Sequence, residues 1–492
     1  MTTQDVNLDA QAVEDAKRLK RIKVIYPLQR FLAALVNSCL PYVNFFYTNI
    51  FMFSVTFTAT MQICSDLVSS LGTPLFSAFL DRVNLKKAKF WPWMLTGSFI
   101  TSFGTILIMC LPFLTGKTVE LMGLVFAIRM VLTIISPMSS APSSAMYPRL
   151  SKDPADRQYF ALAQKIGRDG GKTVFGYIVP LMLIFFSGGG KDSTPAGYAI
   201  TSSICYTISF LAMAVLCLFG LRGSYIEREA MADTTKSKKD KVPFTAMLKV
   251  ILSNRPIAGI SVWFILHKIY YMFYLSYAVY MFRYVFQDIS KQGFFMSVFS
   301  LSAVIGVLFG PLVHKIFKDT KKDLVFAYAV HLGLQIVLWL TFDPARYGLF
   351  LGLFACSSFF MGMLETWILP CYAACAEYGA WVGGVRMDAL AMSIYTLSLR
   401  LCNSLTTVLA AAILNSIDYT NWLAKYNAGE IGVTDTIVKG LTSMFTIWPV
   451  ILASAAILVL IFIYNLNDGK LNLIQQDLKE GKTRATSTLG IK

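Results

Sequence analysis

Two ionisable residues lie beside or inside long apolar runs, where a charge marks either chemistry or a structural pair. Glu365 precedes the apolar run that reaches Glu377, and Arg400 lies deep inside the next run, which follows Arg386. At a rise of ~1.5 Å per helical residue, Glu365 lies ~18 Å from Glu377 and Arg400 lies ~21 Å from Arg386. Both charges therefore fall near the middle of a hydrocarbon layer ~30 Å thick. Because a charge there is costly, such residues usually face a cavity and mark a substrate or ion path.

Basic side chains outnumber acidic ones inside the apolar runs. The bases are Arg129, Lys165, Arg168, Lys268 and Arg400, and the acids are Asp66, Asp169 and Glu365. Excess positive charge in a cavity attracts an anion, which arginine can hold through two hydrogen bonds. The bases expected to bind an acidic solute are Lys165, Arg168, Lys268 and Arg400. The alternative is that each base reaches the membrane surface or pairs with an acid, although Arg168 and Asp169 are expected to point to different faces.

Carboxylates in these runs are candidates for binding a coupling ion. In a low dielectric the neutral form of a carboxyl group is favoured, which lets it take up and release a proton. The candidates are Asp66, Asp169 and Glu365. Ser69 and Thr73 share a helix face with Asp66 and would add oxygen ligands for Na⁺, but this cage is thin, so we favour protons over Na⁺. The alternative for Asp66 is a structural ion pair with Arg129 or Lys165.

Aromatic and hydroxyl side chains supply further candidates for solute contact. Three tyrosines recur on one helix face, at Tyr270, Tyr274 and Tyr277. Sugars stack on aromatic rings and bond to hydroxyls, whereas a packing stripe is the simpler interpretation. Other candidates are Tyr395 and Thr396. His267, beside Lys268, is either a proton relay or a hydrogen-bonded structural residue, and His314 is expected to be solvated.

The composition places these residues in membrane-spanning helices. The 492 residues are 55% hydrophobic and 15% charged, whereas about 25% charged residues are usual in soluble domains. The apolar residues come in long blocks instead of alternating segments, which favours helices over a barrel. The net charge of +16 is concentrated in short connecting segments, which indicates cytoplasmic loops and not nucleic-acid binding.

Apolar runs of about 20 residues predict twelve spans. The first six lie near residues 28–49, 53–80, 92–115, 119–141, 159–186 and 195–221, and the others near 256–285, 292–317, 323–342, 346–377, 387–416 and 442–465. We predict an all-α membrane protein whose two six-helix halves, 28–221 and 256–465, surround a central cavity. A cytoplasmic segment (1–27), linker (222–255) and tail (466–492) complete the chain.

The basic loops lie on one side of the membrane by the positive-inside rule, so both termini are predicted to be cytoplasmic. The candidate gating residues at this side are Asp81, Arg82, Arg157, Glu377, Arg386 and Asp388. The acidic start of the chain shows no cleavable signal peptide. Pro370 is expected to interrupt the tenth span, and glycines at 167, 170 and 171 are expected to permit close helix packing.

The nine scattered cysteines indicate neither disulfides nor a metal site, and no catalytic motif is visible, so we expect no enzyme and no cofactor beyond the coupling ion. The halves also echo each other: Pro74 and Pro311 are each followed by leucine and then a basic loop. Parallel repeats of this kind place a substrate between the halves and alternate its access. Chance similarity is the alternative.

Three stretches carry a family resemblance. DRVNLKKAKFWPW, residues 81–93, resembles the cytoplasmic signature between spans 2 and 3 of the glycoside–pentoside–hexuronide cation symporters, the melibiose permease family of the major facilitator superfamily. SAPSSAMYPRLSKDPADRQYFALAQKIG (140–167) and AEYGAWVGGVRMDALAMSIYTLSLR (376–400) match in order and spacing. The last is the most specific, because E-Y-G, V-R, an acid and a base fourteen residues after the arginine recur together.

The resemblance implies sugar-site roles for Lys165 and Arg400, which occupy the basic positions of spans 5 and 11. Other family positions are changed here. Ser69 and Thr73 replace the paired span-2 carboxylates, Ala33 and Ser140 replace sugar-binding aspartates, Ser144 replaces a tryptophan, and Glu365 replaces an aromatic residue. These departures put the usual cation site and galactoside recognition in doubt.

Together, these observations predict a secondary transporter that moves a sugar-like, acidic small solute by alternating access, coupled to protons. The alternatives are a transporter of a lysolipid or another organic anion, and an uncoupled facilitator. We expect a multi-pass protein of the plasma or inner membrane that needs only a monomer.

Overall fold

The computed structural model describes residues 3–83, 88–146, 150, 154–189, 193–233, 254–383, 388–484 and 486. These residues form helices joined by short turns, and the chain divides into two compact units. The N-terminal unit comprises Met1–Lys239 and Asp288–Ser297, and the C-terminal unit comprises Asp240–Gln287 and Val298–Lys492. The all-α prediction is therefore confirmed.

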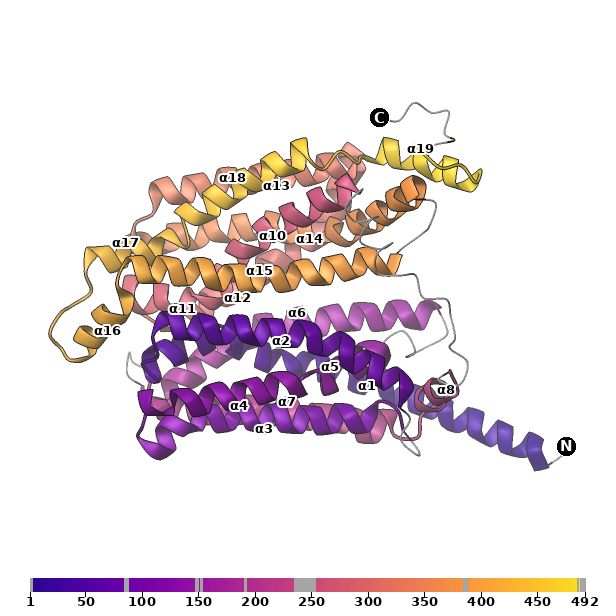
Figure 1. The fold of residues 1–492 in the computed structure, drawn as a ribbon, viewed down its shortest axis with the longest axis horizontal. Coiled ribbons are helices and arrows are strands. Elements are labelled where there is room, and N and C mark those ends of the chain that lie inside the picture. Colours follow the sequence, from indigo (N-terminus) through magenta and orange to yellow (C-terminus); the bar gives the residue numbers. More distant parts are fainter. Residues whose placement is uncertain are drawn as a thin grey trace. The chain divides into compact units, whose positions relative to one another are not determined.

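Long helices lying side by side build the N-terminal unit, with short helices at their ends (Figure 1). In chain order they are α1 (Thr3–Phe45), the π-helix η1 (Phe46–Ile50), α2 (Val55–Arg82), α3 (Trp91–Thr115), the 3₁₀-helix η2 (Val119–Leu121), α4 (Met122–Ile135), α5 (Pro137–Met146), α6 (Pro154–Phe186), α7 (Pro195–Val215), the π-helix η4 (Leu216–Leu221) and α8 (Tyr225–Asp233).

The C-terminal unit has the same kind of architecture (Figure 1). Its elements, with the start of α12 assigned to the other unit, are α10 (Arg255–Ser276), α11 (Ala278–Tyr280), the π-helix η5 (Met281–Val285), α12 (Ser290–Phe317), α13 (Thr320–Thr341), the 3₁₀-helix η6 (Pro344–Arg346), α14 (Tyr347–Gly383), α15 (Asp388–Ser416), α16 (Tyr419–Asn427), α17 (Asp435–Ser443), α18 (Ile447–Phe462) and α19 (Asp468–Lys479).

Eleven helical segments of the described chain are long and apolar enough to cross a membrane, and they correspond to eleven of the twelve expected spans. The remaining one, expected at 53–80, is the 28-residue helix α2. Its polar side chains, among them Gln62 and Asp66, make it less apolar than the others. Pro370 lies inside the continuous helix α14, so the expected interruption of the tenth span is wrong.

The two units repeat one packing scheme. In the N-terminal unit α1 packs on α6 and α7, and α3 packs on α5 and α7. In the C-terminal unit α10 packs on α15 and α18, and α13 packs on α14 and α18. A π-helical turn ends the first span as η1 and the seventh span as η5. This correspondence agrees with the repeat read from the two basic loops.

Two glycines of α6 let it approach α1 closely. A Cβ on Gly167 would lie 3.0 Å from the carbonyl oxygen of Pro27, and one on Gly171 would lie 2.7 Å from that of Phe31. A Cβ on Gly170 would meet nothing within 4 Å. The close-packing role expected of the three glycines therefore holds for Gly167 and Gly171 but not for Gly170.

In each unit, a carboxylate that follows the sixth span binds the start of the third. The buried carboxylate of Glu227, on α8, accepts hydrogen bonds from the backbone N–H groups of Phe90 (2.9 Å) and Trp91 (2.8 Å). Asp468, the first residue of α19, accepts hydrogen bonds from the backbone N–H (2.9 Å) and hydroxyl (3.0 Å) of Thr320. Both acids satisfy N–H groups that a helix start leaves without partners and complement the positive end of its dipole.

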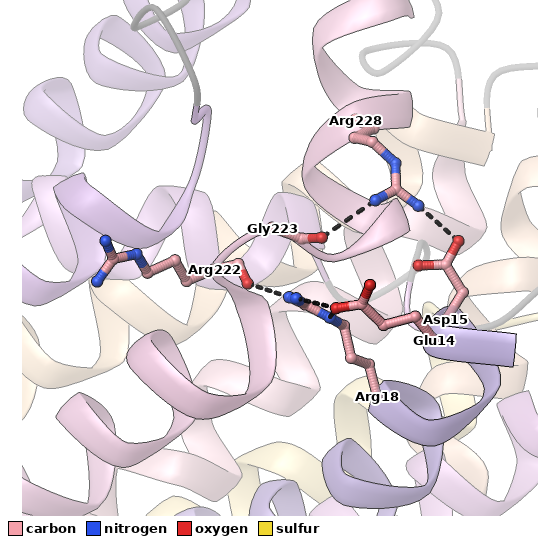
Figure 2. A network of polar contacts seen from close by, with 6 residues as sticks. All are labelled: Glu14, Asp15, Arg18, Arg222, Gly223 and Arg228. Carbon is pink, nitrogen blue, oxygen red and sulfur yellow. Dashed lines mark hydrogen bonds and ion pairs between the residues drawn. The ribbon is translucent and has the colours of Figure 1, made fainter. Parts of the chain in front are cut away.

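Figure 2 shows a second set of contacts at α8, which fastens it to the N-terminal turns of α1. Arg228 donates to the carboxylate of Asp15 at 2.5 Å and to the carbonyl of Gly223 at 3.1 Å. Arg18 donates to Glu14 and to the carbonyl oxygen of Arg222. Exposed ion pairs of this kind add little stability singly, but together they fix where α1 meets the chain leaving the sixth span.

Replacing Gly171 by alanine should lower the melting temperature, whereas Gly170→Ala should not. The new methyl group would lie 2.6 Å from the Cβ of Ala34, so α1 and α6 must move apart, and overpacking costs about 1–3 kcal/mol. Thermal unfolding followed with a thiol-reactive dye reports the difference, because most of the cysteines are not exposed. Equal melting temperatures of the two variants would contradict the close contact.

Glu227→Ala should also lower the melting temperature, because buried N–H groups at the start of α3 lose their acceptor at a cost of about 1–3 kcal/mol. Glu120→Ala is the matched control, since Glu120 is exposed and pairs with Lys117 at the surface. The same dye assay measures both. If Glu227→Ala unfolds no earlier than Glu120→Ala, the carboxylate does not support α3.

Candidate functional site

An ion pair lies near the middle of two spans of the C-terminal unit. The ammonium group of Lys268, on α10, donates a hydrogen bond to the carboxylate of Glu365, at the centre of α14. The ammonium nitrogen also lies 4.5 Å from the ring centre of Tyr271 and 5.6 Å from that of Phe264. The Lys268 side chain is only 8% exposed, whereas Glu365 is 36% exposed. The carboxylate is therefore the accessible member of the pair.

Beside this pair, hydroxyl and imidazole groups of α10 and α13 form a buried cluster of hydrogen-bonded side chains. His267 Nδ1 lies 2.7 Å from the Tyr270 hydroxyl, which lies 3.1 Å from the hydroxyl of Tyr328. On the same helices, the Tyr274 hydroxyl donates to the side-chain oxygen of Gln335 at 3.1 Å. All five side chains are fully buried.

His331 extends the cluster toward α14. Its Nδ1 lies 3.2 Å from the carbonyl oxygen of Ser357 and 2.9 Å from the hydroxyl of the same serine. A carbonyl oxygen only accepts, so Nδ1 is the donor and Nε2 has the lone pair. The amide of Gln335 donates to the Ser357 hydroxyl at 2.6 Å. The contacts with Ser357 thus fix the His331 imidazole in one tautomer, and Gln335 holds the Ser357 hydroxyl in place.

The cluster changes the interpretation of the tyrosine stripe. Tyr270 and Tyr274 were expected to contact a solute, but their hydroxyl groups are engaged inside the unit and both residues are 0% exposed. Such residues hold helices together instead of presenting an open surface. His267 takes the hydrogen-bonded structural role that the sequence left as one of two alternatives.

In the N-terminal unit, Gln62 joins Asp66 to Arg129. The amide nitrogen of Gln62 donates to Asp66 at 3.1 Å, and its oxygen accepts from the Arg129 guanidinium at 3.3 Å. This bridge between α2 and α4 links opposite charges through a neutral group. Asp66 is thus connected to Arg129, one of the two bases expected as its partner, but indirectly.

The hydroxyl groups near Asp66 bond within their own helix. Ser70 donates to the carbonyl oxygen of Asp66 at 2.7 Å, and Thr73 donates to that of Ser69 at 3.0 Å. This i−4 bonding satisfies hydroxyl groups on a helix in an apolar setting. The hydroxyl groups of Ser70 and Thr73 thus have partners within α2 itself.

The bases of α6 differ in their surroundings. Arg168 donates to the carboxylate of its neighbour Asp169 at 2.9 Å, an ion pair that the sequence did not show. Long side chains can turn back toward each other although their Cβ atoms diverge. Lys165 is exposed, and none of the described residues is seen to pair with it. It lies ~8 Å along the helix from the midpoint of α6.

Arg30 is a polar residue of this region that the sequence analysis missed. Its guanidinium donates to the Ser143 hydroxyl at 3.1 Å and lies 4.9 Å from the ring centre of Tyr26. Its Nε is buried and has no hydrogen-bond acceptor among the described residues. Arg30 stands at the start of an apolar run, where a basic residue usually lies at the membrane surface, so the sequence did not single it out. The long helix α1 begins well before it and places it inside.

The remaining solute candidates lie on α5 and α15. Ser140 and Ser144 are exposed, and the Ser144 hydroxyl donates to the carbonyl oxygen of Ser140 at 3.0 Å. Tyr395 packs against the ring of Phe264, with ring centres 5.3 Å apart. On the same helix Thr396 is exposed and Arg400 is half-buried near the midpoint.

Most of the expected gating residues occupy helix ends. Asp81 and Arg82 end α2, Arg157 lies in the first turn of α6, and Asp388 begins α15, while Arg386 lies outside the described residues. Glu377 is not in a turn, because α14 continues to Gly383; its carboxylate accepts a hydrogen bond from Gln475 at 2.8 Å. His314, expected to be solvated, lies 2.6 Å from the buried carboxylate of Asp323.

The comparison with known families covers almost the whole of both units. The family model described as MFS/sugar transport protein matches residues 30–468. The chain belongs to this family. The resemblance to the glycoside–pentoside–hexuronide cation symporters is thereby confirmed, and the chain is a transporter and not an enzyme.

Three relatives illustrate the range of the family. A putative sulfoquinovose importer of Escherichia coli is 27% identical over 70% of this chain and 68% of its own length. The isoprimeverose transporter of Lactiplantibacillus pentosus is 21% identical over 77% and 76%. The inner membrane symporter YicJ of Escherichia coli is 23% identical over 90% and 91%. The chain is therefore similar to symporters and carriers of sugar-like solutes.

Solved structures agree on the fold. A bacterial homologue of the human drug peptide transporters PepT1 and PepT2 superposes with a TM-score of 0.60 at 13% identity, over 94% of this chain and 99% of that chain. The nucleoside transporter NupG gives 0.56 at 14% identity, over 89% and 98%. At these identities the likeness shows the fold, which is the major facilitator fold.

Tyr270→Phe should lower the melting temperature while leaving the half-saturation concentration for solute uptake unchanged. The substitution removes the hydroxyl between His267 and Tyr328, and a net hydrogen bond is worth about 0.5–1.5 kcal/mol. Tyr277→Phe is the matched control, because Tyr277 is buried directly after the same helix and no hydrogen bond of its hydroxyl is seen among the described residues. A raised half-saturation concentration with normal stability would instead place Tyr270 at the solute.

Proposed function

We propose that the protein is a secondary active transporter that moves an acidic, sugar-like solute together with protons. Membership of a sugar-transport family supports a sugar-like solute. The similarity to a putative sulfoquinovose importer supports an acidic one, because sulfoquinovose is a sugar with a sulfonate group. The relatives named symporters support coupling to an ion.

The observation that carries the proposal is the state of Lys165. A basic side chain within a span usually faces a water-filled cavity or has an acidic partner. Lys165 is exposed, and no carboxylate of the described residues is seen to neutralise it. It also occupies a basic position of the sugar site in the family that the sequence resembles. An acidic group on the solute would supply the missing negative charge, whereas a neutral sugar would not.

Protons are the proposed coupling ion. Sodium binding requires several oxygen ligands that converge, and the positions of the family's paired span-2 carboxylates hold Ser69 and Thr73, which carry hydroxyl groups instead. Asp66 and Glu365 are carboxylates near the middle of spans, where gaining a proton removes a costly charge. Asp169, in contrast, is paired with Arg168.

We further propose an inner-membrane protein with both termini in the cytoplasm and a functional monomer. The positive-inside rule supports this orientation, since the basic residues gather in loops that it assigns to one side. A symporter of the inner membrane is among the relatives. The half boundaries at 28–221 and 256–465 and the gating roles of Asp81, Arg82, Arg157, Arg386 and Asp388 belong to the same proposal.

Uptake into proteoliposomes tests the function. The panel consists of sulfoquinovose, glucuronate, glucose, isoprimeverose and a lysolipid, each measured with a pH gradient and with a Na⁺ gradient imposed separately. Accumulation of an acidic sugar driven by the pH gradient is expected. Three outcomes would overturn the proposed function. Na⁺-driven uptake of a neutral sugar would indicate a sodium symporter, uptake of the lysolipid alone would indicate a lipid transporter, and equilibration without accumulation would indicate an uncoupled facilitator.

Lys165→Gln should reduce uptake of the acidic sugar at least tenfold at low concentration, because the charge that meets its anionic group is lost; one charge-assisted hydrogen bond is worth about 1.5–3 kcal/mol. Lys117→Gln is the control, since Lys117 is exposed and paired with Glu120 in the connection between α3 and α4. Initial rates over a range of solute concentrations give the half-saturation concentration and the maximal rate of uptake. Unchanged kinetics in Lys165→Gln would exclude that lysine from the solute site.

A further inference from the structure

The ion pair between Lys268 and Glu365 has an asymmetry that its structural role does not require. The cation is 8% exposed and the anion 36% exposed, so protons and solutes can reach Glu365 more readily than Lys268. In this state the ammonium group already has an anionic partner. A second anion can bind it only if Glu365 withdraws.

The ammonium group is held in place by more than Glu365. The rings of Tyr271 and Phe264 lie 4.5 Å and 5.6 Å from its nitrogen, and a cation over an aromatic face is attracted to it. Both rings belong to α10, the helix that carries Lys268. The position of the cation is therefore set within one helix, whereas its anion comes from α14. Glu365 can move away without taking the cation with it.

We propose that Glu365 couples protons to solute binding by exchanging with the solute's acidic group on Lys268. This inference rests on the proposed function and assigns the coupling step to the C-terminal unit. Protonation forms an O–H bond on Glu365 and removes its attraction for Lys268. The anionic group of the solute then replaces the carboxylate as partner of the ammonium. One proton and one solute anion enter the site together.

The exchange leaves the net charge of the site unchanged. Before it, Lys268 and Glu365 sum to zero; after it, Lys268 and the solute anion sum to zero beside a neutral carboxyl group. Protonation of Glu365 without a solute anion would leave the buried ammonium group unpaired, which is strongly disfavoured, so the proton and the anion bind together. Binding of proton and solute is mutually favourable, since each makes room for the other, and this reciprocity is required of any linked pair of ligands.

The neighbouring ionisable groups do not offer the same exchange. On α10, His267 is bonded to Tyr270, and the ammonium of Lys268 disfavours a second positive charge beside it. On α13, Tyr328 and His331 belong to the buried cluster. The ionisable side chains of α15 nearest in sequence to its midpoint are Cys402, Arg400 and Tyr395, none of which is a carboxylic acid, while α18 and residues 298–313 of α12 have none.

Two consequences distinguish this coupling from others. Affinity for an acidic solute must fall as the pH rises, by up to about tenfold per unit once Glu365 is ionised in the free protein. Transport of one anion with one proton moves no net charge. Accumulation should therefore follow a pH gradient and ignore a membrane potential set with potassium and valinomycin.

The test uses the full-length protein and sulfoquinovose, whose sulfonate stays ionised over the pH range studied. Calorimetry between pH 5.5 and 8.5 gives the affinity, and a pH indicator in weak buffer gives the protons taken up on binding. The wild type should lose affinity with rising pH and take up about one proton per solute in the alkaline part of the range. Glu365→Gln should bind at every pH with nearly constant affinity, take up no proton, and fail to accumulate solute.

Two further variants guard against misfolding. Lys268→Gln combined with Glu365→Gln removes both charges, so it should fold, bind sulfoquinovose at least tenfold more weakly than Glu365→Gln, and show no pH dependence. Asp343→Asn, which breaks a surface pair with Arg346, should behave as the wild type. If Glu365→Gln, or the double variant, retains the pH-dependent binding and proton uptake, the exchange is overturned.

The proposal and the proposed function fail in different ways. Should the wild type accumulate sulfoquinovose with protons while Glu365→Gln keeps the same proton uptake, the function stands and the exchange is wrong. Should accumulation respond to the membrane potential, a one-to-one exchange is wrong although a proton-coupled acidic solute remains. Should the wild type bind neither sulfoquinovose nor glucuronate, the acidic-solute function fails and the exchange falls with it.

Discussion

A charge inside a hydrocarbon layer needs an opposite charge or strong polar partners, and this requirement accounts for the contacts of several charged side chains within the spans of both units. Lys268 and Glu365 neutralise each other between α10 and α14. Gln62 connects Arg129 to Asp66, and Arg168 turns to Asp169. Lys165 is different, because no acidic partner for it is seen among the described residues. A negatively charged group of the solute is expected to neutralise it.

The same requirement separates structural polarity from functional polarity. The cluster of His267, Tyr270, Tyr328 and His331 is fully buried, and its hydrogen bonds run from His267 through Tyr270 to Tyr328, while His331 bonds to Ser357. It specifies how α10 and α13 pack and leaves little for a ligand to gain. Where a charged group is partly open and its partner can be exchanged, as at Glu365, polarity can instead respond to protons and solutes.

The spans were predictable because hydropathy depends only on local composition, and counting residues placed Glu365 and Arg400 near the middle of their helices. The partners were not predictable in the same way. Which face of α2 meets α4 decides that Gln62 bridges Arg129, and this depends on helix rotation that periodicity does not fix. Arg30 was missed, and the tenth span was predicted to end at Glu377, because the helices α1 and α14 extend beyond the apolar runs that the sequence shows.

The carboxylates at the start of the third span of each unit also say something about the order of synthesis. Glu227 follows Phe90 by 137 residues, and Asp468 follows Thr320 by 148. The carboxylate that accepts hydrogen bonds from the N-terminal turn of α3 or α13 is thus synthesised only after the six spans of that half. The contact at the start of α3 or α13 therefore forms only after the helix that follows the sixth span of that half has been made. A nascent half that lacks this final contact differs chemically from a finished one by exposed backbone N–H groups at one defined helix end.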